Sequence, residues 1–424
     1  MIADGSRTHD PHDCIVVGGG PAGSTVGTLL AQLGHRVLLL EKSRFPRHHI
    51  GESLMPQTYW ILERLGMLAK LKASDFPVKE SVQFVSASGQ ESQPYFFPDR
   101  DPNDWSFTWQ VKRDRFDLMM LDNAREHGVE VREGVRVSEV LFDGSRAVGV
   151  RIAGDSANTD VRTKVVIDAT GVNAVLSKQL GIREGEPDLK NAAIYAYWKG
   201  AHRDPGRNAG ATLVISTPDK QGWFWSIPLP NDITSIGIVA KPQYLITGRG
   251  DDPLATLEEE IAKTPGILRR VENADRVSQA YVTSDFTYRS RRIAGDGWVL
   301  CGDAFGFLDP IYSSGVFLAL KMGELTADTV HEALRDGDLR GERLGRHGPK
   351  VARGMQLIRQ LVYAFYDPNF SFGTFNRDYP QYHDHIVRLL IGDVFNDEVG
   401  DVFDVMRRSV SLPAPVELEG SVRA

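Results

Sequence analysis

The sequence predicts an α/β protein with a doubly wound βαβ domain, a mostly β layer inserted into it and a helical region at its C-terminal end. Three observations predict this fold class. Near the N-terminus, a glycine-rich turn joins an apolar run to a helical pattern, and two later apolar runs each end in a glycine turn. Between those later runs lies a long region rich in aromatic and β-branched residues, which favours an inserted sheet.

The N-terminal glycine turn carries a dinucleotide-binding fingerprint. The apolar run 14–17 leads into Gly18-x-Gly20-x-x-Gly23, a helical pattern and a second apolar run that ends at Glu41. The first glycine allows a tight turn, the second lets a pyrophosphate approach the backbone, and the third lets the helix pack closely on the sheet. The free N–H groups at the helix start then face the diphosphate. Glu41 lies where a carboxylate accepts hydrogen bonds from ribose hydroxyls, which disfavours a 2′-phosphate.

Composition excludes several classes of function. The chain has 424 residues and a net charge of −7, without the basic stripe that nucleic-acid binding requires. Its two cysteines, Cys14 and Cys301, lie in apolar runs, so we expect buried thiols in a reducing compartment. No apolar run approaches the ~20 residues of a membrane helix. Residues 1–12 are polar and do not resemble a signal peptide, so we expect a loose arm on a soluble, cytoplasmic protein without a nucleic-acid or membrane partner.

Alternating helices and strands are expected after the fingerprint. A helix is predicted over 57–71, strands over 82–85 and 105–111, and a helix over 118–127 that ends at Gly128. Short strands follow as far as residue 150. The apolar run 165–168 then ends in a turn at Gly171, which is typical of a strand that returns beside the first one.

The second half of the chain provides the inserted layer and the helical region. Residues 192–287 have strand composition, the run 298–301 leads into Gly302-Asp303, and an amphipathic helix is expected over 317–334. The charged, glycine-rich stretch 336–350 marks a boundary. The expected division is 13–80, 106–190 and 284–335 for the nucleotide-binding domain, 81–105 and 191–283 for a β-rich substrate domain, 336–411 for the helical region, and 412–424 for a loose tail.

The second glycine turn favours FAD over NAD. An aspartate in this position, Asp303, can hydrogen bond the ribityl chain of a flavin, whereas an NAD-dependent fold has no need of such a second site. The charged loop after Glu41 could fold back over the cofactor, with Arg47 available to a phosphate or to the flavin ring. The alternative for this loop, including His48 and His49, is a solvated connection.

Over nearly its whole length the chain resembles the FAD-dependent enzymes with the aromatic-hydroxylase fold, which is related to that of glutathione reductase. The fingerprint, the element Val111-x-Arg113-x-x-Phe116-Asp117, the turn at 168–171 and Gly302-Asp303 occur in that family's order. Two shorter motifs are similar to those of flavin-dependent halogenases. They are Trp223-x-Trp225-x-Ile227-Pro228 and Phe307-x-x-Pro310-x-x-Ser313-x-Gly315.

The resemblance implies a reaction in which reduced FAD, oxygen and chloride or bromide give hypohalous acid beside the flavin. The amides around Ser314 and Gly315 would hold the halide, because converging backbone N–H groups form an anion nest. Trp223 and Trp225 would separate the flavin from the organic substrate. The alternative for these tryptophans is core packing, since strand alternation places both on one face.

Lys79 matches the position of the halogenase family's essential lysine. Its ammonium could hydrogen bond hypohalous acid, or its amine could form a haloamine, which desolvation would favour. By sequence alone a surface lysine is the simpler interpretation. The resemblance also implies FAD contacts from a larger set of residues: Gly18, Gly20, Pro21, Ala22, Gly23, Glu41, Lys42, Arg47, Arg113, Gly302, Asp303, Pro310, Gly315 and Val316. No metal site is expected.

One departure from the family narrows the substrate. The resemblance implies that tryptophan halogenases carry a glutamate at the position of Tyr312, and that this glutamate assists loss of the ring proton. A tyrosine, with a reference pKa of about 10, is no base near neutral pH. The substrate is therefore expected to be an electron-rich phenol or pyrrole, free or tethered to a carrier protein. The resemblance implies that a separate flavin reductase supplies the reduced FAD.

Three alternatives stay open at the level of sequence. An FAD-dependent aromatic monooxygenase would use the same cofactor chemistry to transfer oxygen, and a geranylgeranyl-reductase-like flavoenzyme would reduce an isoprenoid double bond. A non-catalytic flavin electron carrier is disfavoured, because it needs no large substrate layer and the chain has no Cys-x-x-Cys or cluster ligands. The reaction of the reduced flavin with oxygen would separate these classes.

Overall fold

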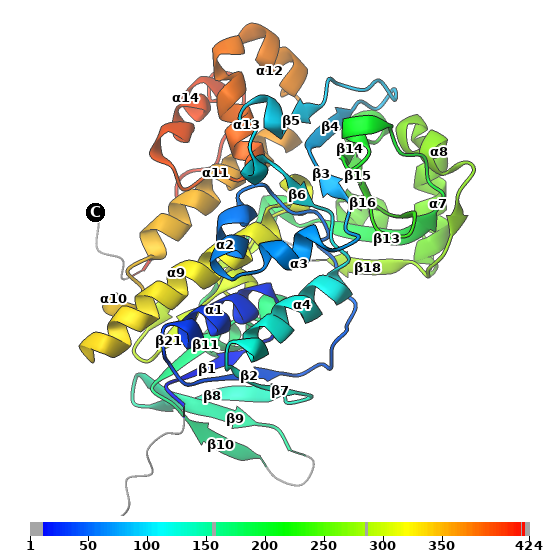
Figure 1. Cartoon of the computed structure of the whole chain (residues 1–424). Helices are drawn as coiled ribbons and strands as arrows, with labels where there is room; N and C mark the ends of the chain where they lie inside the picture. The colour runs from blue at the N-terminus through cyan, green and yellow to red at the C-terminus, as the bar shows by residue number, and fades with distance from the viewer. Residues whose placement is uncertain (1–11, 155–157, 285–286, 417, 420–424) are drawn as a thin grey trace, which may run out of the picture.

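The computed structural model describes residues 12–154, 158–284, 287–416 and 418–419. Residues 1–11, most of the expected N-terminal arm, lie outside this part of the chain. Figure 1 shows two layers built around separate sheets, with a group of helices beside them that belongs to the C-terminal part of the chain. The arrangement has the α/β class and the inserted β layer that the sequence predicts.

A six-stranded sheet forms the base of the first layer, in the order β20-β21-β11-β1-β2-β7. Its pairs are parallel except for β20 with β21. The strands are Cys14–Val17 (β1), Val37–Glu41 (β2), Glu130–Glu133 (β7), Val165–Asp168 (β11), Ala294–Gly295 (β20) and Trp298–Leu300 (β21). Because β1, β2 and β11 are buried on both faces, they consist of continuous apolar runs.

Helices cover this sheet, and three of them lie along one face in Figure 1: Pro21–Gln32 (α1), Arg113–Glu126 (α4) and Ser314–Asp336 (α9). Helix α9 starts and ends slightly beyond the range expected for it, and α4 starts five residues before its expected start at 118. The expected helix 57–71 is interrupted at Gly66, whose φ of +72° is a left-handed conformation, and forms Thr58–Arg64 (α2) and Leu68–Lys72 (α3). Smaller elements complete the layer: Val137–Asp143 (β8), Arg146–Ile152 (β9), Thr159–Arg162 (β10), Val175–Gln179 (α5), Arg183–Gly185 (β12), Tyr288–Ser290 (β19) and Gly306–Phe307 (β22).

The second layer is an eight-stranded sheet in the order β17-β13-β16-β15-β14-β4-β5, with β18 also paired to β13. The strands are Ser81–Val85 (β4), Tyr95–Phe96 (β5), Ala192–Lys199 (β13), Thr212–Ser216 (β14), Gly222–Pro228 (β15), Ile233–Ala240 (β16), Asp275–Arg276 (β17) and Tyr281–Ser284 (β18). The layer is less purely β than its composition suggests. Three helices, Pro242–Leu245 (α6), Pro253–Lys263 (α7) and Pro265–Val271 (α8), belong to it.

The two faces of this second sheet join different cores. Phe224 and Ile238 pack with Leu257 of α7 and Ile267 of α8 in a core of their own. Trp223 and Trp225 instead join the core that continues into the first layer. Strand alternation on β15 therefore turns both tryptophans toward the junction of the two layers.

Two short strands bring the layers together. Val78–Lys79 (β3) pairs antiparallel with Thr108–Trp109 (β6), and these lie between the first layer and β4. The strand expected over 105–111 is mostly irregular, because residues 104–106 form a 3-10 turn.

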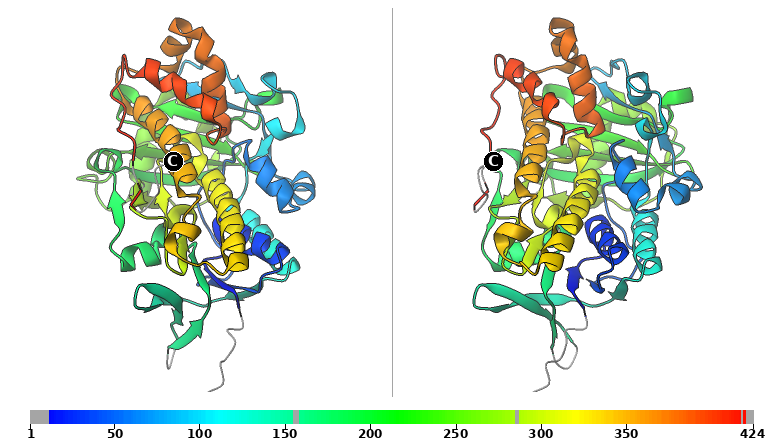
Figure 2. Two further views of the ribbon diagram at one scale, coloured as in Figure 1. Left: turned by 90° about the vertical axis from the view of Figure 1, so that its left-hand side faces the viewer. Right: turned by 60° about the vertical axis from the view of Figure 1, so that its left-hand side comes forward.

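The C-terminal helices are Gly341–Leu344 (α10), Gly348–Tyr366 (α11), Phe372–Asp378 (α12), His383–Ile391 (α13) and Val402–Met406 (α14). Figure 2 shows α11 beside α9, with α12, α13 and α14 beyond its C-terminal end. The described part of the segment after residue 411 makes contacts with the rest of the chain. Ala414 accepts a hydrogen bond from Arg359 of α11, and the amide of Glu419 donates to the Arg291 carbonyl.

The fingerprint glycines can be tested within one helix. A Cβ on Gly23 would lie 1.9 Å from the Gly18 carbonyl oxygen, whereas one on Gly27 would meet its nearest atom at 3.7 Å. We expect Gly23→Ala to cost about 3 kcal/mol of unfolding free energy, because the helix must move off the turn. Gly27→Ala should be neutral or stabilise by about 0.5–1 kcal/mol, as expected for alanine in a helix interior. Urea denaturation measures both, and equal effects of the two variants would contradict the close-approach argument.

Candidate active site

The fingerprint turn follows β1 at the carboxyl end of the parallel sheet. Gly18 has a φ of +106°, and a Cβ there would lie 2.3 Å from the Ala169 carbonyl oxygen. Only a glycine fits both this conformation and this approach. Above Gly20 the nearest atom to an added Cβ is Nη2 of Arg47, at 3.5 Å. The start of α1, with Pro21 as its first residue, therefore faces a space bounded by a guanidinium, which fits a diphosphate.

Glu41 ends β2 where the sequence predicts it, and its carboxylate is already bonded to the backbone. It accepts hydrogen bonds of 2.7 Å from the amides of Gly19 and of Ser43. Each oxygen keeps a further lone pair, so the residue can accept a ribose hydroxyl while it holds the turn. The neighbouring Lys42 is exposed.

Arg113 and Arg47 share the buried carboxylate of Asp117. Arg113 binds both oxygens of Asp117, at 2.7 and 3.0 Å, and donates to the carbonyls of Ile50 and Gly51 at 2.8 and 3.2 Å. Arg47 forms a 3.4 Å ion pair with Asp117, and its buried Nη1 has no hydrogen-bond partner among the described residues. Arg113 thus organises the loop after β2, whereas Arg47 has a donor free for a cofactor.

Gly302 and Asp303 lie at the carboxyl end of β21, which β11 separates from β1 in the same sheet. Gly302 has a φ of +62°, and a Cβ there would lie 2.8 Å from that of Ala22 in α1, so the two turns are in contact. Burial raises the pKa of Asp303 to about 7, and the charge of Arg113 opposes this rise. A hydroxyl group that donates a hydrogen bond would stabilise the charged form of Asp303, so this residue fits the ribityl chain of FAD. The nearby Asp168 is structural, since it accepts from the amides of Thr170 and Leu176.

The second short motif forms a turn before α9. The turn 310–312 is followed by Ser313 with a φ of +58°, and α9 starts at Ser314. Ser314 is 1% exposed, and within the described part of the chain its hydroxyl has no hydrogen-bond partner. The amides of the first helical turn, which include Gly315 and Val316, have no partner within the helix. An unsatisfied hydroxyl beside unpaired amides is a suitable donor set for a halide ion.

This turn lies against the loop that carries the arginines. A Cβ built on Gly51 would lie 2.9 Å from Nη1 of Arg113 and 3.8 Å from a methyl group of Val316. Pro310 is half-buried at the start of the turn. The expected cofactor loop and the expected halide loop are therefore neighbours.

Lys79 is buried at the junction of the two layers, with 3% of its surface exposed. Its ammonium donates to the Ser53 hydroxyl at 2.9 Å and to the Leu54 carbonyl at 3.0 Å. Within the described ranges no carboxylate forms an ion pair with it. Burial lowers the pKa of Lys79 to about 7. The structure therefore excludes the simpler interpretation of Lys79 as a surface lysine.

Polar groups that sequence reasoning missed hold this lysine in place. The Ser53 hydroxyl is 2.8 Å from that of Thr212, on β14 of the second layer. Gln110 donates to the Thr212 hydroxyl at 2.9 Å and to the Gly210 carbonyl at 2.8 Å. Ser53 belongs to the charged loop noted in the sequence, but Gln110 and Thr212 lack any local signal.

The two tryptophans of the first short motif are buried, with 2% and 7% of their surfaces exposed. Their ring centroids are 6.2 Å apart. Trp223 donates to the Tyr366 hydroxyl at 2.8 Å, and Trp225 donates to the Ser235 hydroxyl at 3.1 Å. Their burial fits a wall between the layers, and packing and separation of two compartments are compatible roles.

A second buried acid lies near this wall. Glu52 is 2% exposed and accepts from the Tyr197 hydroxyl at 2.9 Å, and its second oxygen has no hydrogen-bond partner in the described ranges. Burial raises the pKa of Glu52 to about 7. His48 stacks on Tyr281 with a centroid distance of 4.4 Å and bonds the Tyr195 hydroxyl at 3.0 Å. The loop containing His48 and Glu52 therefore contacts the second layer.

The surroundings of Tyr312 do not suit a base. Its hydroxyl donates to the Leu361 carbonyl at 3.1 Å, and its ring meets Phe365 and Phe372 of the C-terminal region edge to face. Burial raises the pKa of Tyr312 well above 10, so the phenol keeps its proton.

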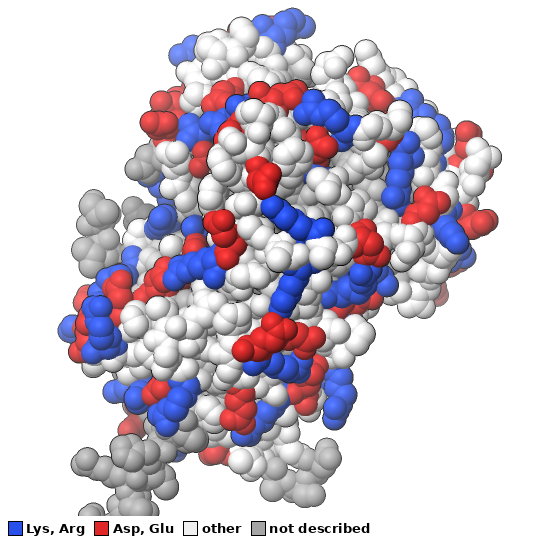
Figure 3. Space-filling view, in the orientation of Figure 1, with Lys and Arg blue, Asp and Glu red and all other residues white. Residues whose placement is uncertain are grey.

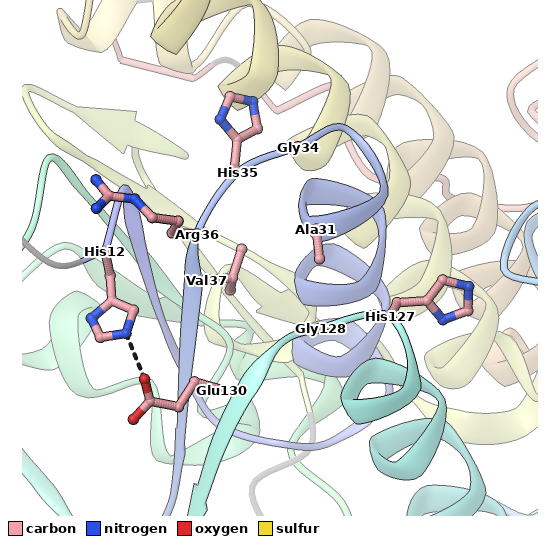
Figure 4. A pocket seen from close by; sticks show the side chains of 9 residues that line it. All are labelled: His12, Ala31, Gly34, His35, Arg36, Val37, His127, Gly128 and Glu130. Carbon is pink, nitrogen blue, oxygen red and sulfur yellow. Dashed lines mark hydrogen bonds and ion pairs between the residues drawn. The ribbon is translucent and has the colours of Figure 1, made fainter.

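Other features of the surface are less suited to this chemistry. A pocket of about 400 Å³ near His12, His35 and Arg36 lies at the amino ends of the parallel strands, opposite the fingerprint (Figure 4). On the face shown in Figure 3, basic and acidic side chains alternate. No helix in the described ranges is long and apolar enough to cross a membrane.

Comparison with known proteins decides the family. The sequence pattern of the tryptophan halogenase family matches residues 13–98 and 97–375. The chain belongs to this family. Its expected class, a flavin-dependent oxidoreductase with FAD as cofactor, is confirmed at the level of the family. The monooxygenase, reductase and electron-carrier alternatives are not supported.

Two similar relatives have named activities. The 1H-pyrrole-2-carbonyl-[peptidyl-carrier protein] brominase of Pseudoalteromonas luteoviolacea is 35% identical over 94% of this chain and 96% of its own. The corresponding chlorinase of Pseudomonas fluorescens is 31% identical over 95% of this chain and 94% of its own. Both are halogenases similar to this one over nearly the full length.

Solved structures agree with the fold of this halogenase. The flavin-dependent brominase Bmp2 matches with a TM-score of 0.84 and 31% identity, over 94% of this chain and 98% of its own. The myxobacterial chondrochloren halogenase CndH matches with a TM-score of 0.77 and 33% identity, over 92% of each chain. The predicted FAD-type α/β fold is therefore confirmed.

The burial of Lys79 predicts a dependence of stability on pH. Its amine loses its proton near pH 7 in the folded protein but near pH 10.4 in the unfolded chain, so between these values the unfolded state binds more protons. Lys79 therefore destabilises the fold most at and below pH 7, and this cost falls as the pH rises toward 10. We expect the stability gain of Lys79→Met over the native enzyme to decline from pH 7 to pH 10 in parallel urea titrations. A difference that does not change with pH would contradict the low pKa.

Proposed function

We propose that this halogenase places a halogen on an electron-rich pyrrole ring tethered to a carrier protein, with Lys79 as the residue that delivers the halogen. The observation that carries the proposal is the environment of Lys79. Its nitrogen is buried between the layers and bonded to the Ser53 hydroxyl and the Leu54 carbonyl, without a counter-ion among the described residues. A buried, uncompensated lysine is costly, which is typical of a functional position.

The hydrogen bonds of Lys79 leave one position on its nitrogen free. An ammonium has three N–H donors, and two of them are used by Ser53 and Leu54. In the protonated form the third N–H can donate to hypohalous acid and increase its electrophilic character. In the neutral form, which a pKa of about 7 makes accessible, the nitrogen lone pair can attack the halogen of hypohalous acid. The nitrogen–halogen bond forms as the oxygen–halogen bond breaks, and the hydroxide that is released takes a proton from the nitrogen and leaves as water. In both protonation states the Lys79 nitrogen is the atom that meets hypohalous acid.

The proposed site has two parts, one for FAD and the halide and one for the organic substrate. FAD, when bound, supplies the chemistry that converts halide and oxygen to hypohalous acid. Ser314 and the first amides of α9 would hold the halide, while Arg47, Glu41 and Asp303 would hold the cofactor. Trp223 and Trp225 would keep the organic substrate away from the cofactor and water away from the oxidant.

Two arguments support a pyrrole on a carrier. Tyr312 is a hydrogen-bonded phenol with a raised pKa, so this position supplies no base for a ring that holds its proton firmly. Pyrrole rings are electron-rich enough to react without one. The two relatives named above act, by their names, on the pyrrole-2-carbonyl group of a peptidyl carrier protein. A separate flavin reductase is proposed as the source of reduced FAD.

Replacement of Lys79 tests its role. We expect Lys79→Met, which keeps the side-chain volume, to bind FAD as the native enzyme does but to form about 10³-fold less halogenated product. Lys70→Met is the control, because Lys70 is half-buried on α3 and pairs with Glu126 at 2.6 Å, outside the site. Mass spectrometry of the product measures the change. Halogenation retained by Lys79→Met would remove Lys79 from the mechanism.

The substrate is tested with matched pairs of rings. Reduced FAD, oxygen and either bromide or chloride are supplied with a pyrrolyl-carrier protein, with free pyrrole-2-carboxylate or with a simple phenol. We expect rapid halogenation of the carrier-bound ring and at least about tenfold slower reaction of the free acid, because the tether raises the local concentration of the ring. Faster reaction of the phenol would contradict the pyrrole assignment while leaving the halogenase family intact.

A further inference from the structure

A buried hydrogen-bond network links the two short motifs to the C-terminal helical region. Tyr366, the last residue of α11, lies at its centre. Its hydroxyl accepts from Nε1 of Trp223 at 2.8 Å and donates to Oδ2 of Asp309 at 2.9 Å. Asn191, just before β13, donates to the same Asp309 oxygen at 2.8 Å and to the Tyr366 hydroxyl at 3.1 Å. Four segments that are distant in sequence therefore meet at one phenol.

The network has a carboxylate at its end and no cation in contact with it. Asp309 is fully buried, and within the described chain no ion pair neutralises it. Lys241, whose charge acts on Asp309 from a distance, hydrogen bonds the backbone carbonyl of Asp188 instead. The carboxylate therefore depends on neutral donors, namely Tyr366, Asn191 and the amide of Ile311 at 3.2 Å. Burial raises the pKa of Asp309, and these three donors oppose the rise because they stabilise the charged form, so the bonds hold the carboxylate in position.

Asp309 also immediately precedes the turn 310–312, which leads to the proposed halide site and which we call the halide turn. Its Oδ1 caps the turn 310–312 through the Ile311 amide, and the turn leads directly to Ser314 and the first amides of α9. A shift of the Asp309 carboxylate would therefore shift the start of the turn that orients those amides. The Tyr366 hydroxyl is also the only acceptor that the indole N–H of Trp223 has among the described residues, so removal of this hydroxyl would leave that N–H unpaired.

We propose that Tyr366 is a positioning residue that sets the halide turn and the tryptophan wall relative to each other. This inference rests on the proposed halide site at Ser314 and Gly315. It assigns to the C-terminal helical region a direct part in the geometry of the halogenating compartment. Tyr366 itself touches neither the halide nor the substrate in this account, and it acts through Asp309 on one side and Trp223 on the other.

The test compares two tyrosines on one helix. Tyr363 lies one turn before Tyr366 on α11 and donates its hydroxyl to Glu186 at 2.7 Å, away from the network. Tyr363→Phe and Tyr366→Phe therefore remove the same group, each bonded to a carboxylate. Two quantities are measured on the FAD-loaded, oxidised enzyme: the chloride dissociation constant, from the line width of the chloride NMR signal, and hydrogen exchange of the peptide 308–316 by mass spectrometry. FAD affinity is measured on both variants to confirm that each retains its fold.

We expect Tyr366→Phe to raise the chloride dissociation constant about tenfold and to accelerate exchange in 308–316 by a similar factor, because a buried carboxylate and a buried indole each lose a partner. Tyr363→Phe should change neither quantity. If both variants bind chloride and exchange like the native enzyme, the inference is overturned. It is equally overturned if Tyr366→Phe loses FAD affinity together with halide affinity, since its role is then general packing. Failure of the native enzyme to bind chloride would instead contradict the halide site, while the exchange data would still decide whether Tyr366 orders the turn.

Discussion

Lys79 is buried, and no carboxylate among the described residues forms an ion pair with it, which constrains the structure of the whole site. Moving an ammonium out of water is unfavourable, so the protein must hold it with neutral acceptors and tolerate a lowered pKa. Those acceptors come from the loop after β2, through Ser53 and Leu54, and Ser53 is in turn fixed by Thr212 of the second layer. The lysine is therefore buried only when the two layers meet, which couples the site to the complete fold.

A buried ion pair between Arg113 and Asp117 also holds the loop after β2 in place. Asp117 on α4 binds Arg113 through both carboxylate oxygens, and Arg113 fixes the carbonyls of Ile50 and Gly51. Gly51 is adjacent to Val316, so the loop that would cover the cofactor also supports the turn proposed to hold halide. Removing one partner of such a buried pair leaves an uncompensated charge, which makes the pair a structural requirement whatever its net contribution to stability.

The sequence predicts those parts of the fold and site that have a local cause. Gly18 is required by the left-handed turn after β1 and Gly23 by the close approach of α1 to that turn, and the buried strands are continuous apolar runs, so both features are visible in the sequence. The break in the helix at Gly66 has a local cause, a glycine in the left-handed conformation, which the prediction of one continuous helix overlooked. The short β3–β6 pair was missed because it joins two segments that no local pattern relates. Lys79 was indicated by resemblance alone. Its partners, like Tyr366 and Glu52, are set by contacts between distant segments that no local pattern records.

We infer that Lys79 is a buried amine able to act in both protonation states near neutral pH. Its own titration tests this inference and can be followed by carbon NMR of lysine labelled at Cε, with the signal assigned by its absence in Lys79→Met. We expect one lysine with a pKa near 7, well apart from the others, because burial disfavours the ammonium. A signal with a pKa near 10.4, the value of a solvated lysine, would contradict the proposed role of Lys79.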